Sequence, residues 1–299
     1  MNRTVVRALS VTVAVAAALA TVTACGGSDD TAGGDGGKGG TLLKLDPVAA
    51  LREVQQKTGD AQSARIEGTT TMGEMMSMEQ SGVLGWSDGV SGEMEITYTG
   101  GTMARTMKSS GVTGPVQARY FKDGYVMNMG AAAAQQLGGK SWIRYTYEDL
   151  EKMAGAAGSV LKDQIQNSTP QQSVKALLAS GDVKRVGQEK IRGVETTHFS
   201  GTVDVAELST ANSDLDKGQL EQFRKQLSSA GITTQEVDIW VDKNHLLVKK
   251  VESGKMKTGS FDSTLYYSDY GTKISVERPP ASDTVDFQEL MAAAGQGSS

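Results

Sequence analysis

Cys25 is the only cysteine of the 299-residue chain, and its thiol stands where acylation chemistry would place it. The residues before it give a cationic start with Arg3 and Arg7, an apolar run from Ala8 to Ala20, and Val22-Thr23-Ala24. This order is typical of a bacterial lipoprotein signal, in which the cysteine accepts diacylglycerol. Residues 1–24 are therefore expected to be a signal peptide, and Cys25 the first residue of the mature protein.

Two other fates of this segment stay open, namely ordinary secretory cleavage and an uncleaved membrane helix. The apolar run is shorter than the ~20 residues that a bilayer-spanning helix needs, which favours the acylated form. Acylation consumes the thiol, so no cysteine remains for a disulfide or for nucleophilic catalysis. We expect the protein at the extracytoplasmic face of the cell membrane, anchored by covalent diacylglycerol on Cys25 and without another cofactor.

Residues 25–44 are predicted to form a flexible tether. Eight of the fifteen residues after Cys25 are glycine, and none of the fifteen is large and apolar. A random coil of this length has a root-mean-square reach of about 21 Å. Removal of Arg3 and Arg7 with the signal changes the formal net charge from −5 to −7. An acidic chain gives no reason to expect nucleic acid as a partner.

Methionine is concentrated in one part of the chain. Nine of the 13 methionines lie between Met72 and Met129, and the densest group is Met72-Gly73-Glu74-Met75-Met76-Ser77-Met78. Thioethers are ligands for Cu(I), but neither histidine lies near this group. The other interpretations of the segment are a mobile apolar hairpin tip and an exposed contact for a partner or membrane. Met72–Met78 is thus a candidate contact for ligand, partner or metal.

Enzyme motifs are not found. The sequence contains no His-Glu-x-x-His, no Gly-x-Ser-x-Gly and no phosphate-binding glycine loop. His198 alternates with Thr196 and Ser200 on a polar strand face, and His245 stands beside a predicted turn. Both histidines are expected to be bystanders, and we expect no catalysis.

Alternation of apolar and polar residues predicts antiparallel strands with one solvated face. The apolar positions of the five clearest segments are Met94, Ile96, Tyr98; Tyr125, Met127, Met129; Phe199, Val203, Val205; Val237, Ile239, Val241; and Phe261, Leu265, Tyr267. Turns are predicted at Ser87-Asp88-Gly89, Lys122-Asp123-Gly124, Arg192-Gly193 and Asp242-Lys243-Asn244. About ten or eleven strands result.

Four amphipathic helices are predicted. One begins at Asp46-Pro47, one covers residues 146–157, one follows Thr169-Pro170-Gln171-Gln172 as a capping box, and one runs from about Leu215 to Ala230. The predicted fold class is α+β, with a large curved antiparallel sheet whose concave face is covered by these helices. Because short helices cannot fill so wide a sheet, an apolar cavity between the layers is expected. Residues 45–295 are predicted to be a single domain.

The chain resembles the LolA-like carriers and the actinobacterial lipoproteins of the LppX/LprG type. The resemblance covers most of residues 45–280 and rests on four features. These are the lipobox at Cys25, the stretch Asp46-Pro47-Val48-Ala49-Ala50-Leu51, the helical insertion near residues 146–180, and the hairpin from Val237 to Val251. It implies a half-open β-barrel whose interior takes up the acyl chains of a lipid or lipoprotein.

The resemblance also implies which residues line that interior. On the sheet they are Met94, Ile96, Tyr98, Tyr125, Met127, Met129, Val237, Ile239 and Val241, and on the helical lid Leu150, Met153, Leu177 and Leu178. Each could equally belong to a dry core, because the apolar faces of all sheets are buried.

Two functions therefore stay open. One is the binding of a lipid or other acylated molecule in the cavity, for transport or sensing. The other is a surface lipoprotein that docks another envelope protein without transport. A solute-binding protein of an importer is disfavoured, because its parallel strands would give continuous apolar runs.

Overall fold

The structure is a computed structural model that describes residues 45–296 apart from 155–157, 159–161, 163–164, 167–168, 212–214, 230 and 257–258. The predicted signal peptide, Cys25 and the whole of the predicted tether lie outside the described residues. The strands are β1 (Ser63–Met72), β2 (Met76–Gly85), β3 (Ser91–Gly100), β4 (Val116–Phe121), β5 (Gly124–Asn128), β6 (Trp142–Thr146), β7 (Lys184–Ile191), β8 (Val194–Asp204), β9 (Thr234–Asp242), β10 (Leu247–Met256), β11 (Gly259–Ser268) and β12 (Thr284–Asp286). The helices are α1 (Pro47–Asp60), α2 (Gly101–Ser109), α3 (Gly130–Gln136), α4 (Tyr147–Ala154), α6 (Pro170–Ser180), α7 (Lys217–Ser229) and α8 (Phe287–Gln296), with a 3-10 turn at Ala281–Asp283.

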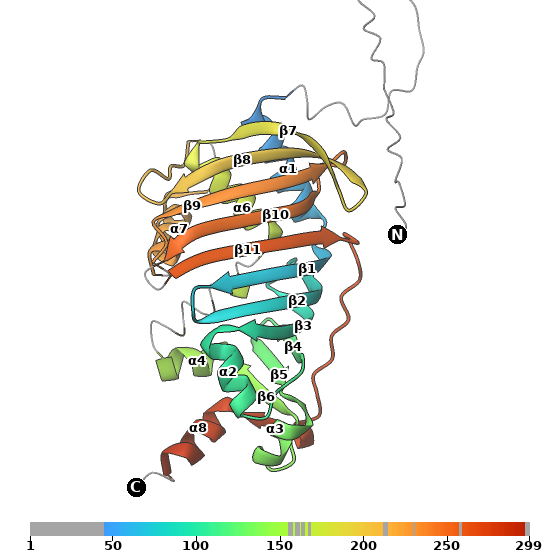
Figure 1. The fold of residues 1–299 in the computed structure, drawn as a ribbon, viewed down its shortest axis with the longest axis vertical. Coiled ribbons are helices and arrows are strands. Elements are labelled where there is room, and N and C mark those ends of the chain that lie inside the picture. Colours follow the sequence, from blue (N-terminus) through green and yellow to red (C-terminus); the bar gives the residue numbers. More distant parts are fainter. Residues whose placement is uncertain are drawn as a thin grey trace, which may run out of the picture. The chain divides into compact units, whose positions relative to one another are not determined.

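The strands form one sheet of 12 strands in the order β12-β6-β5-β4-β3-β2-β1-β11-β10-β9-β8-β7 (Figure 1). Neighbours are antiparallel except β12 and β6, which are parallel. The predicted fold class, α+β with a large open curved sheet, is confirmed. The strand beyond the expected ten or eleven is β12, which is only three residues long and has no alternating pattern to reveal it.

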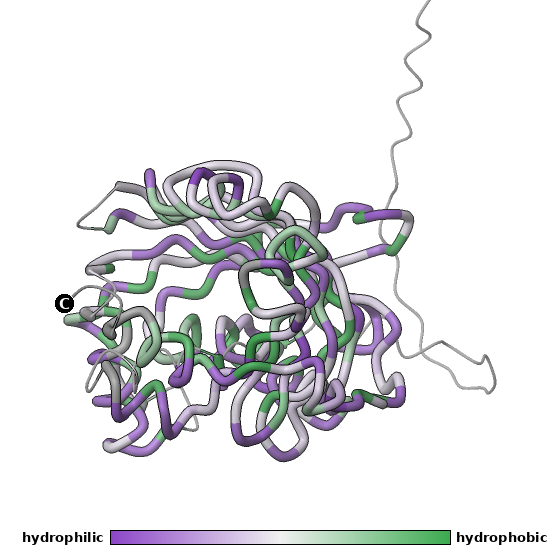
Figure 2. Tube along the Cα trace, turned by 90° about the horizontal axis from the view of Figure 1, so that it is seen from below, coloured by the Kyte–Doolittle hydropathy of each residue, from purple (hydrophilic) through white to green (hydrophobic). Residues whose placement is uncertain are grey.

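The four predicted turns join strands as expected. Lys122-Asp123 links β4 to β5, Arg192-Gly193 links β7 to β8, residues 243–246 link β9 to β10, and Ser87-Asp88-Gly89 lies between β2 and β3. Arg192 adopts a φ of 47° and the following Gly193 a φ of 88°, and glycine tolerates such positive values without strain. Figure 2 shows the resulting alternation of hydrophilic and hydrophobic residues along the strands.

One face of the sheet, called here the inner face, packs on helices. Figure 1 shows α1, α6 and α7 behind β7 to β11. The core there consists of strand residues such as Phe199, Val203 and Ile239, each 0% exposed, together with Leu51 of α1 and Leu177 of α6. This half of the sheet is closed by helix packing.

The helix starts follow the sequence closely, with one exception. The Asp46 carboxylate accepts hydrogen bonds from the backbone N–H groups of Val48 (3.0 Å) and Ala49 (3.1 Å) and thereby caps α1. Thr169 precedes α6 but makes no capping hydrogen bond with its side chain, so the predicted capping box is wrong. Pro170 at the first helical position, with its fixed φ, suits the start of α6 without that cap.

The helices α2, α3 and α8 were not predicted. α2 carries no capping side chain and no buried residue, so the amphipathic pattern that a packed helix leaves is weak in its sequence. The strand β5 ends at Asn128, and Met129 is the residue that precedes α3. Met129 therefore does not continue the predicted strand, because the chain turns into a helix at Gly130, which has a φ of 79°.

Candidate functional site

The inner face of β3 to β6 carries a row of apolar side chains in direct register. Met94 pairs with Ala118, Ala118 with Met127, and Met127 with Ile143. Met94, Ala118 and Ile143 are buried, whereas Met127 is only half-buried. Since paired residues of antiparallel strands share a face, these four side chains form a continuous apolar floor.

Three tyrosines form a second row beside this floor. Tyr120 of β4, Tyr125 of β5 and Tyr145 of β6 are cross-strand partners. The ring centroids of Tyr120 and Tyr125 are 6.0 Å apart, and those of Tyr125 and Tyr145 are stacked at 4.8 Å. Phe287, the first residue of α8, extends the row with its centroid 4.7 Å from that of Tyr145. Such contacts stabilise aromatic pairs beyond the burial of their area.

A fourth tyrosine, Tyr98, lies near the other end of the floor on β3. Burial raises the pKa of Tyr98, and burial followed by the interaction with Tyr98 raises the pKa of Tyr145 to about 12. The pKa values of Tyr120 and Tyr125 are raised as well, first by burial and then by neighbouring tyrosines, Tyr98 among them. All four tyrosines therefore stay protonated at neutral pH.

Tyr98 also lines a hollow of about 390 Å³ between β3 and α2. The other lining residues are Thr97, Thr99, Ala104, Met107, Lys108, Val112, Thr113 and Gly114. A small apolar cluster of Val112, Val116 and Ala133 adjoins it, with Tyr98, Met107, Met127 and Met129 packed against that cluster. Three residues that the sequence singled out, Tyr98, Met127 and Met129, are thus brought together here.

The remaining predicted lining residues are more deeply placed. Ile96 is 7% and Leu150 8% exposed, and Leu177, Leu178, Val237, Ile239 and Val241 are each 0% exposed. The last five belong to the closed core under α6 and its neighbours. The side chain of Met153 lies outside the described residues.

The α6 helix covers a charged pair that the alternation pattern did not predict. Lys250 Nζ lies 2.9 Å from Glu252 Oε2, and the two side chains are 11% and 12% exposed. Ser173 Oγ of α6 donates to Glu252 (2.6 Å) and accepts from Lys250 (2.9 Å). An irregularity in the pairing between Leu247 and Lys249 changes the register of β10 and places both charges on the inner face. The available signal was the opposite charge of two residues that are two positions apart on one strand.

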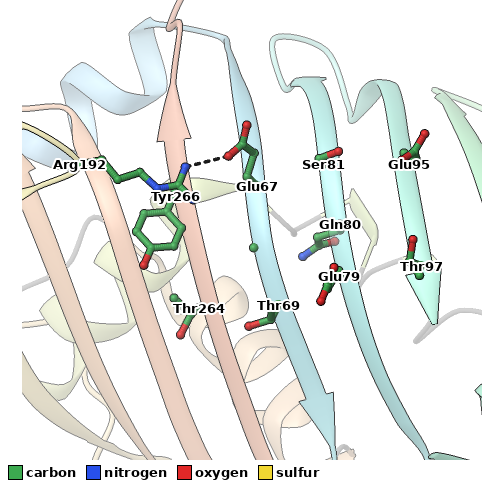
Figure 3. Close-up of a pocket in the computed structure, with 11 residues that line it drawn as sticks. Glu67, Thr69, Glu79, Gln80, Ser81, Glu95, Thr97, Arg192, Thr264 and Tyr266 are labelled. Carbon is green, nitrogen blue, oxygen red and sulfur yellow. Dashed lines mark hydrogen bonds and ion pairs between the residues drawn. The ribbon is translucent and has the colours of Figure 1, made fainter. Parts of the chain in front are cut away.

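The outer face of the sheet carries a polar hollow of about 490 Å³ (Figure 3). Glu67, Glu79, Glu95 and Tyr266 line it from the strands, and Arg192 reaches it from the turn between β7 and β8. Arg192 pairs with Glu67 at 2.7 Å, and its guanidinium lies 3.8 Å from the centroid of the Tyr266 ring. This hollow is lined by charges and hydroxyls, in contrast to the inner face.

Neither histidine lies on β3 to β6, the strands that carry the inner-face tyrosines. His198 on the outer face stacks on Trp240 at 4.2 Å and bonds to Asp238 at 2.7 Å. His245 Nδ1 lies 2.5 Å from a carboxylate oxygen of Glu53 in α1. Both histidines therefore have structural partners.

The methionine-rich segment Met72–Met78 forms the hairpin between β1 and β2. The carbonyl groups of Glu74 and Met75 accept hydrogen bonds of 2.9 Å from the first N–H groups of α2, those of Thr102 and Met103. Met75 is 47% exposed. The hairpin tip is therefore tied to α2 and presents one thioether to solvent.

The described part of the chain offers neither a metal-binding cluster nor a membrane-spanning helix. It holds no group of three or more His, Cys, Asp or Glu side chains arranged to bind a metal. None of its helices has the length and apolar character needed to cross a membrane.

Comparison with known proteins finds close relatives and more distant structures. A Streptomyces griseus protein named "Uncharacterized 31.2 kDa protein in rplA-rplJ intergenic region" is 65% identical over 254 residues, which are 85% of this chain and 83% of that protein. A Streptomyces coelicolor protein named "Putative lipoprotein SCO4650" is 46% identical over 311 aligned residues, covering 99% of this chain and 100% of that protein. No family model matches the chain.

Among solved structures, LprF from Mycobacterium bovis has a TM-score of 0.46 and 12% identity, covering 79% of this chain and 97% of that one. The lipoprotein LppX from Mycobacterium tuberculosis has a TM-score of 0.43 and 16% identity, covering 78% of this chain and 100% of that one. LppX is one of the proteins that the sequence was found to resemble. On the identity and coverage of the two Streptomyces sequences, the chain belongs to their family, one member of which carries the name of a lipoprotein.

Proposed function

We propose that the protein is a membrane-anchored extracytoplasmic lipoprotein that binds a lipid or other acylated molecule on the inner face of β3 to β6. The anchor is diacylglycerol on Cys25. The ligand surface consists of Met94, Ile96, Tyr98, Tyr125, Met127 and Met129, with Leu150 beside it. The proposal includes no catalytic step and leaves both transport and sensing as uses of the bound molecule.

The observation that carries the proposal is the contrast between the two halves of the inner face. Under α1 and α6 the strand side chains of Phe199, Val237, Ile239 and Val241 are 0% exposed, whereas Met78, Tyr98, Tyr120 and Met127 are half-buried although they pack against the same core. Half-buried apolar and aromatic side chains next to a hollow are what a hydrocarbon chain would cover. Ten methylenes moved from water to such a surface contribute roughly 8 kcal/mol.

Methionine suits this surface because its unbranched side chain adapts to chains of different shape. The fully buried residues Leu177, Leu178, Val237, Ile239 and Val241 would reach a ligand only if α6 moved away from the sheet. We therefore place the first contact of the acyl chain at the tyrosine and methionine side of the sheet.

The test is the lipid content of a secreted protein that begins after Cys25 and carries no anchor of its own. Mass spectrometry of the intact protein and of its lipid extract should find a co-purifying acylated molecule. Met127→Trp fills the inner face, and the bound fraction should fall roughly tenfold, because displaced methylenes lose about 0.8 kcal/mol each.

Gln117→Trp is the matched control, since Gln117 is exposed on the outer face and lies next to Ala118 in the same hairpin. It should leave the lipid content unchanged. Lipid-free protein, or equal loss of lipid in both variants at equal stability, would contradict the proposal. The first of these outcomes would favour docking of an envelope protein, for which the outer-face hollow is the available surface.

A further inference from the structure

The hydroxyl groups of Tyr98, Tyr120, Tyr125 and Tyr145 are not explained by the packing of their rings. Within the residues that the structure describes, none of these four hydroxyls has a hydrogen-bond partner. Two other tyrosines differ in this respect, since Tyr147 accepts from Gln166 at 3.0 Å and Tyr270 donates to the carbonyl of Leu247 at 2.7 Å. None of the four is among the fully buried polar atoms of the described residues that lack a partner, so each hydroxyl reaches solvent and is open to an acceptor from a ligand.

The ring faces are less available than the hydroxyls. Tyr125 has Tyr120 on one side and Tyr145 on the other, and Tyr145 lies between Tyr125 and Phe287. A cation such as a quaternary ammonium group needs an open aromatic face, and the faces of Tyr125 and Tyr145 are taken by other rings. What the row offers to a ligand is its hydroxyl edge.

The hydroxyls act as donors because they remain neutral. Burial raises the pKa of each of the four tyrosines, and their mutual repulsion as phenolates raises the pKa of Tyr120, Tyr125 and Tyr145 further. A neutral phenol donates one hydrogen bond. Four donors around an apolar floor of Met94, Ala118, Met127 and Ile143 match a molecule that has a hydrocarbon chain and an oxygen acceptor.

We propose that hydroxyls of this set of four tyrosines recognise the carboxyl or ester group of the acyl ligand, one or two of them donating to its carbonyl oxygen, while its hydrocarbon chain lies on the apolar floor. The inference rests on the proposed function and specifies the chemistry of the ligand. A fatty acid and an acyl ester share this acceptor, and the experiment separates them.

The experiment uses the delipidated chain without residues 1–25 and a neutral fluorescent probe, N-phenyl-1-naphthylamine. Dodecanoic acid, methyl dodecanoate and dodecane, which share one chain length, compete for the probe. The carbonyl compounds should displace it at concentrations at least about tenfold below that of dodecane, since one or two hydrogen bonds distinguish them. The acid and the ester arms show which of the two carbonyl groups is preferred.

Tyr125→Phe with Tyr145→Phe keeps the rings and removes two hydroxyls. This variant should lose most of the preference for a carbonyl and keep the affinity for dodecane, whereas Tyr266→Phe on the outer face should change neither. Alkaline titration of phenolate absorbance gives a second readout, because a bound acceptor should raise the pKa of these tyrosines.

The outcomes are distinct. Displacement by dodecane and by the ester at equal concentrations, or an unchanged preference in the double variant, would overturn this inference and leave the proposed function standing. Failure of the probe and of all three compounds to bind would overturn the proposed function and this inference with it.

Discussion

At the scale of single residues, Lys250 and Glu252 form a nearly buried ion pair on the inner face, where an unpaired charge would cost much free energy. Two nearly buried charges are separated by 2.9 Å and joined through Ser173, which is 2% exposed. Each charge satisfies the other, and the serine hydroxyl of α6 closes the set. Loss of one charge would leave its partner desolvated without compensation.

Lys250→Met should therefore destabilise the protein by about 3 kcal/mol, the cost typical of removing one partner of a buried ion pair. Urea unfolding measures this change. Lys190→Met is the control, because Lys190 and Glu195 pair at 2.9 Å while 59% and 75% exposed, and its loss should matter by less than about 1 kcal/mol. Replacement of both buried charges, in Lys250→Met with Glu252→Leu, should recover much of the loss. Equal stability of the two lysine variants would contradict this account.

The tyrosines predict a loss of stability in alkali. An unfolded tyrosine has a pKa of about 10. In the folded protein burial raises the pKa of Tyr145 to about 12, and it raises the pKa values of Tyr120 and Tyr125 as well. The folded state holds these protons more tightly, so its stability is fully present below about pH 10 and falls as the pH rises through the folded pKa values. Urea midpoints measured at about pH 8.5 and 11 test this, and Tyr125→Phe with Tyr145→Phe should reduce the difference between them. A midpoint that does not change with pH would show that these phenols are not protected.

At the scale of elements, the two edges of the sheet are protected in different ways. The edge strand β7 has a register shift between Arg185 and Gly187, and Val186 within it is 60% exposed. The other edge, β6, is covered by β12, and Arg144 donates to both carboxylate oxygens of Asp286 at 2.5 and 2.7 Å. Bulges and covering segments both prevent strands from pairing with other chains.

Deletion of residues 281–299 should consequently cause concentration-dependent association. The deletion exposes the unpaired backbone groups of β6, which can then accept a strand from another molecule. Light scattering after size-exclusion chromatography should show a larger mass than that of the intact chain at the same concentration. A chain shortened only by residues 297–299 is the control, and identical masses for all three proteins would argue against an edge-protecting role for β12.

The elements also show what the sequence could and could not predict. Some elements are specified by their own residues. They include the hairpins with Asp123-Gly124 or Arg192-Gly193, and the helices with Asp46-Pro47 or a stripe such as Leu220, Phe223 and Leu227. A strand of three residues such as β12 is too short to show an alternating pattern. β12 forms because it pairs with β6, which lies far away in the chain.

The same division holds within the candidate site. Tyr98, Tyr125 and Met127 were found because they alternate along their strands. The row Tyr120–Tyr125–Tyr145 and the pair under α6 depend on the pairing register between strands, and the sequence of one strand does not contain it. Phe287 joins the row only because the C-terminal segment returns to β6.

At the scale of the whole molecule, the proposed anchor sets where the binding face works. The predicted tether joins Cys25 to α1, so acylation would hold the folded part within a few tens of ångströms of the membrane. This geometry suits exchange of acyl chains with a nearby bilayer.

Cys25→Ala should release the protein from the membrane fraction into the medium, because the thiol that accepts the lipid is gone. Fractionation of cells followed by immunoblotting gives the distribution, and mass spectrometry of the wild type should find the acylated cysteine. Cys25 is the residue to change, and Ser28→Ala in the tether serves as the control that should stay with the membrane. Wild-type protein that carries no acyl group on Cys25 would disprove the lipid anchor.

The centre of the sheet joins two parts of the chain that are distant in sequence. β1 and β11 pair in register from Arg65 with Ser268 to Met72 with Phe261, while α1 and α6 pack behind the sheet and β12 closes the edge at β6. A chain cut between α4 and α6 would yield two fragments, one holding β1 to β6 and the other β7 to β12. Each fragment would display an edge strand, β1 or β11, whose partner lies in the other fragment. Fusing the two fragments to two other proteins would therefore give a split reporter that assembles when those proteins come together outside the cytoplasm.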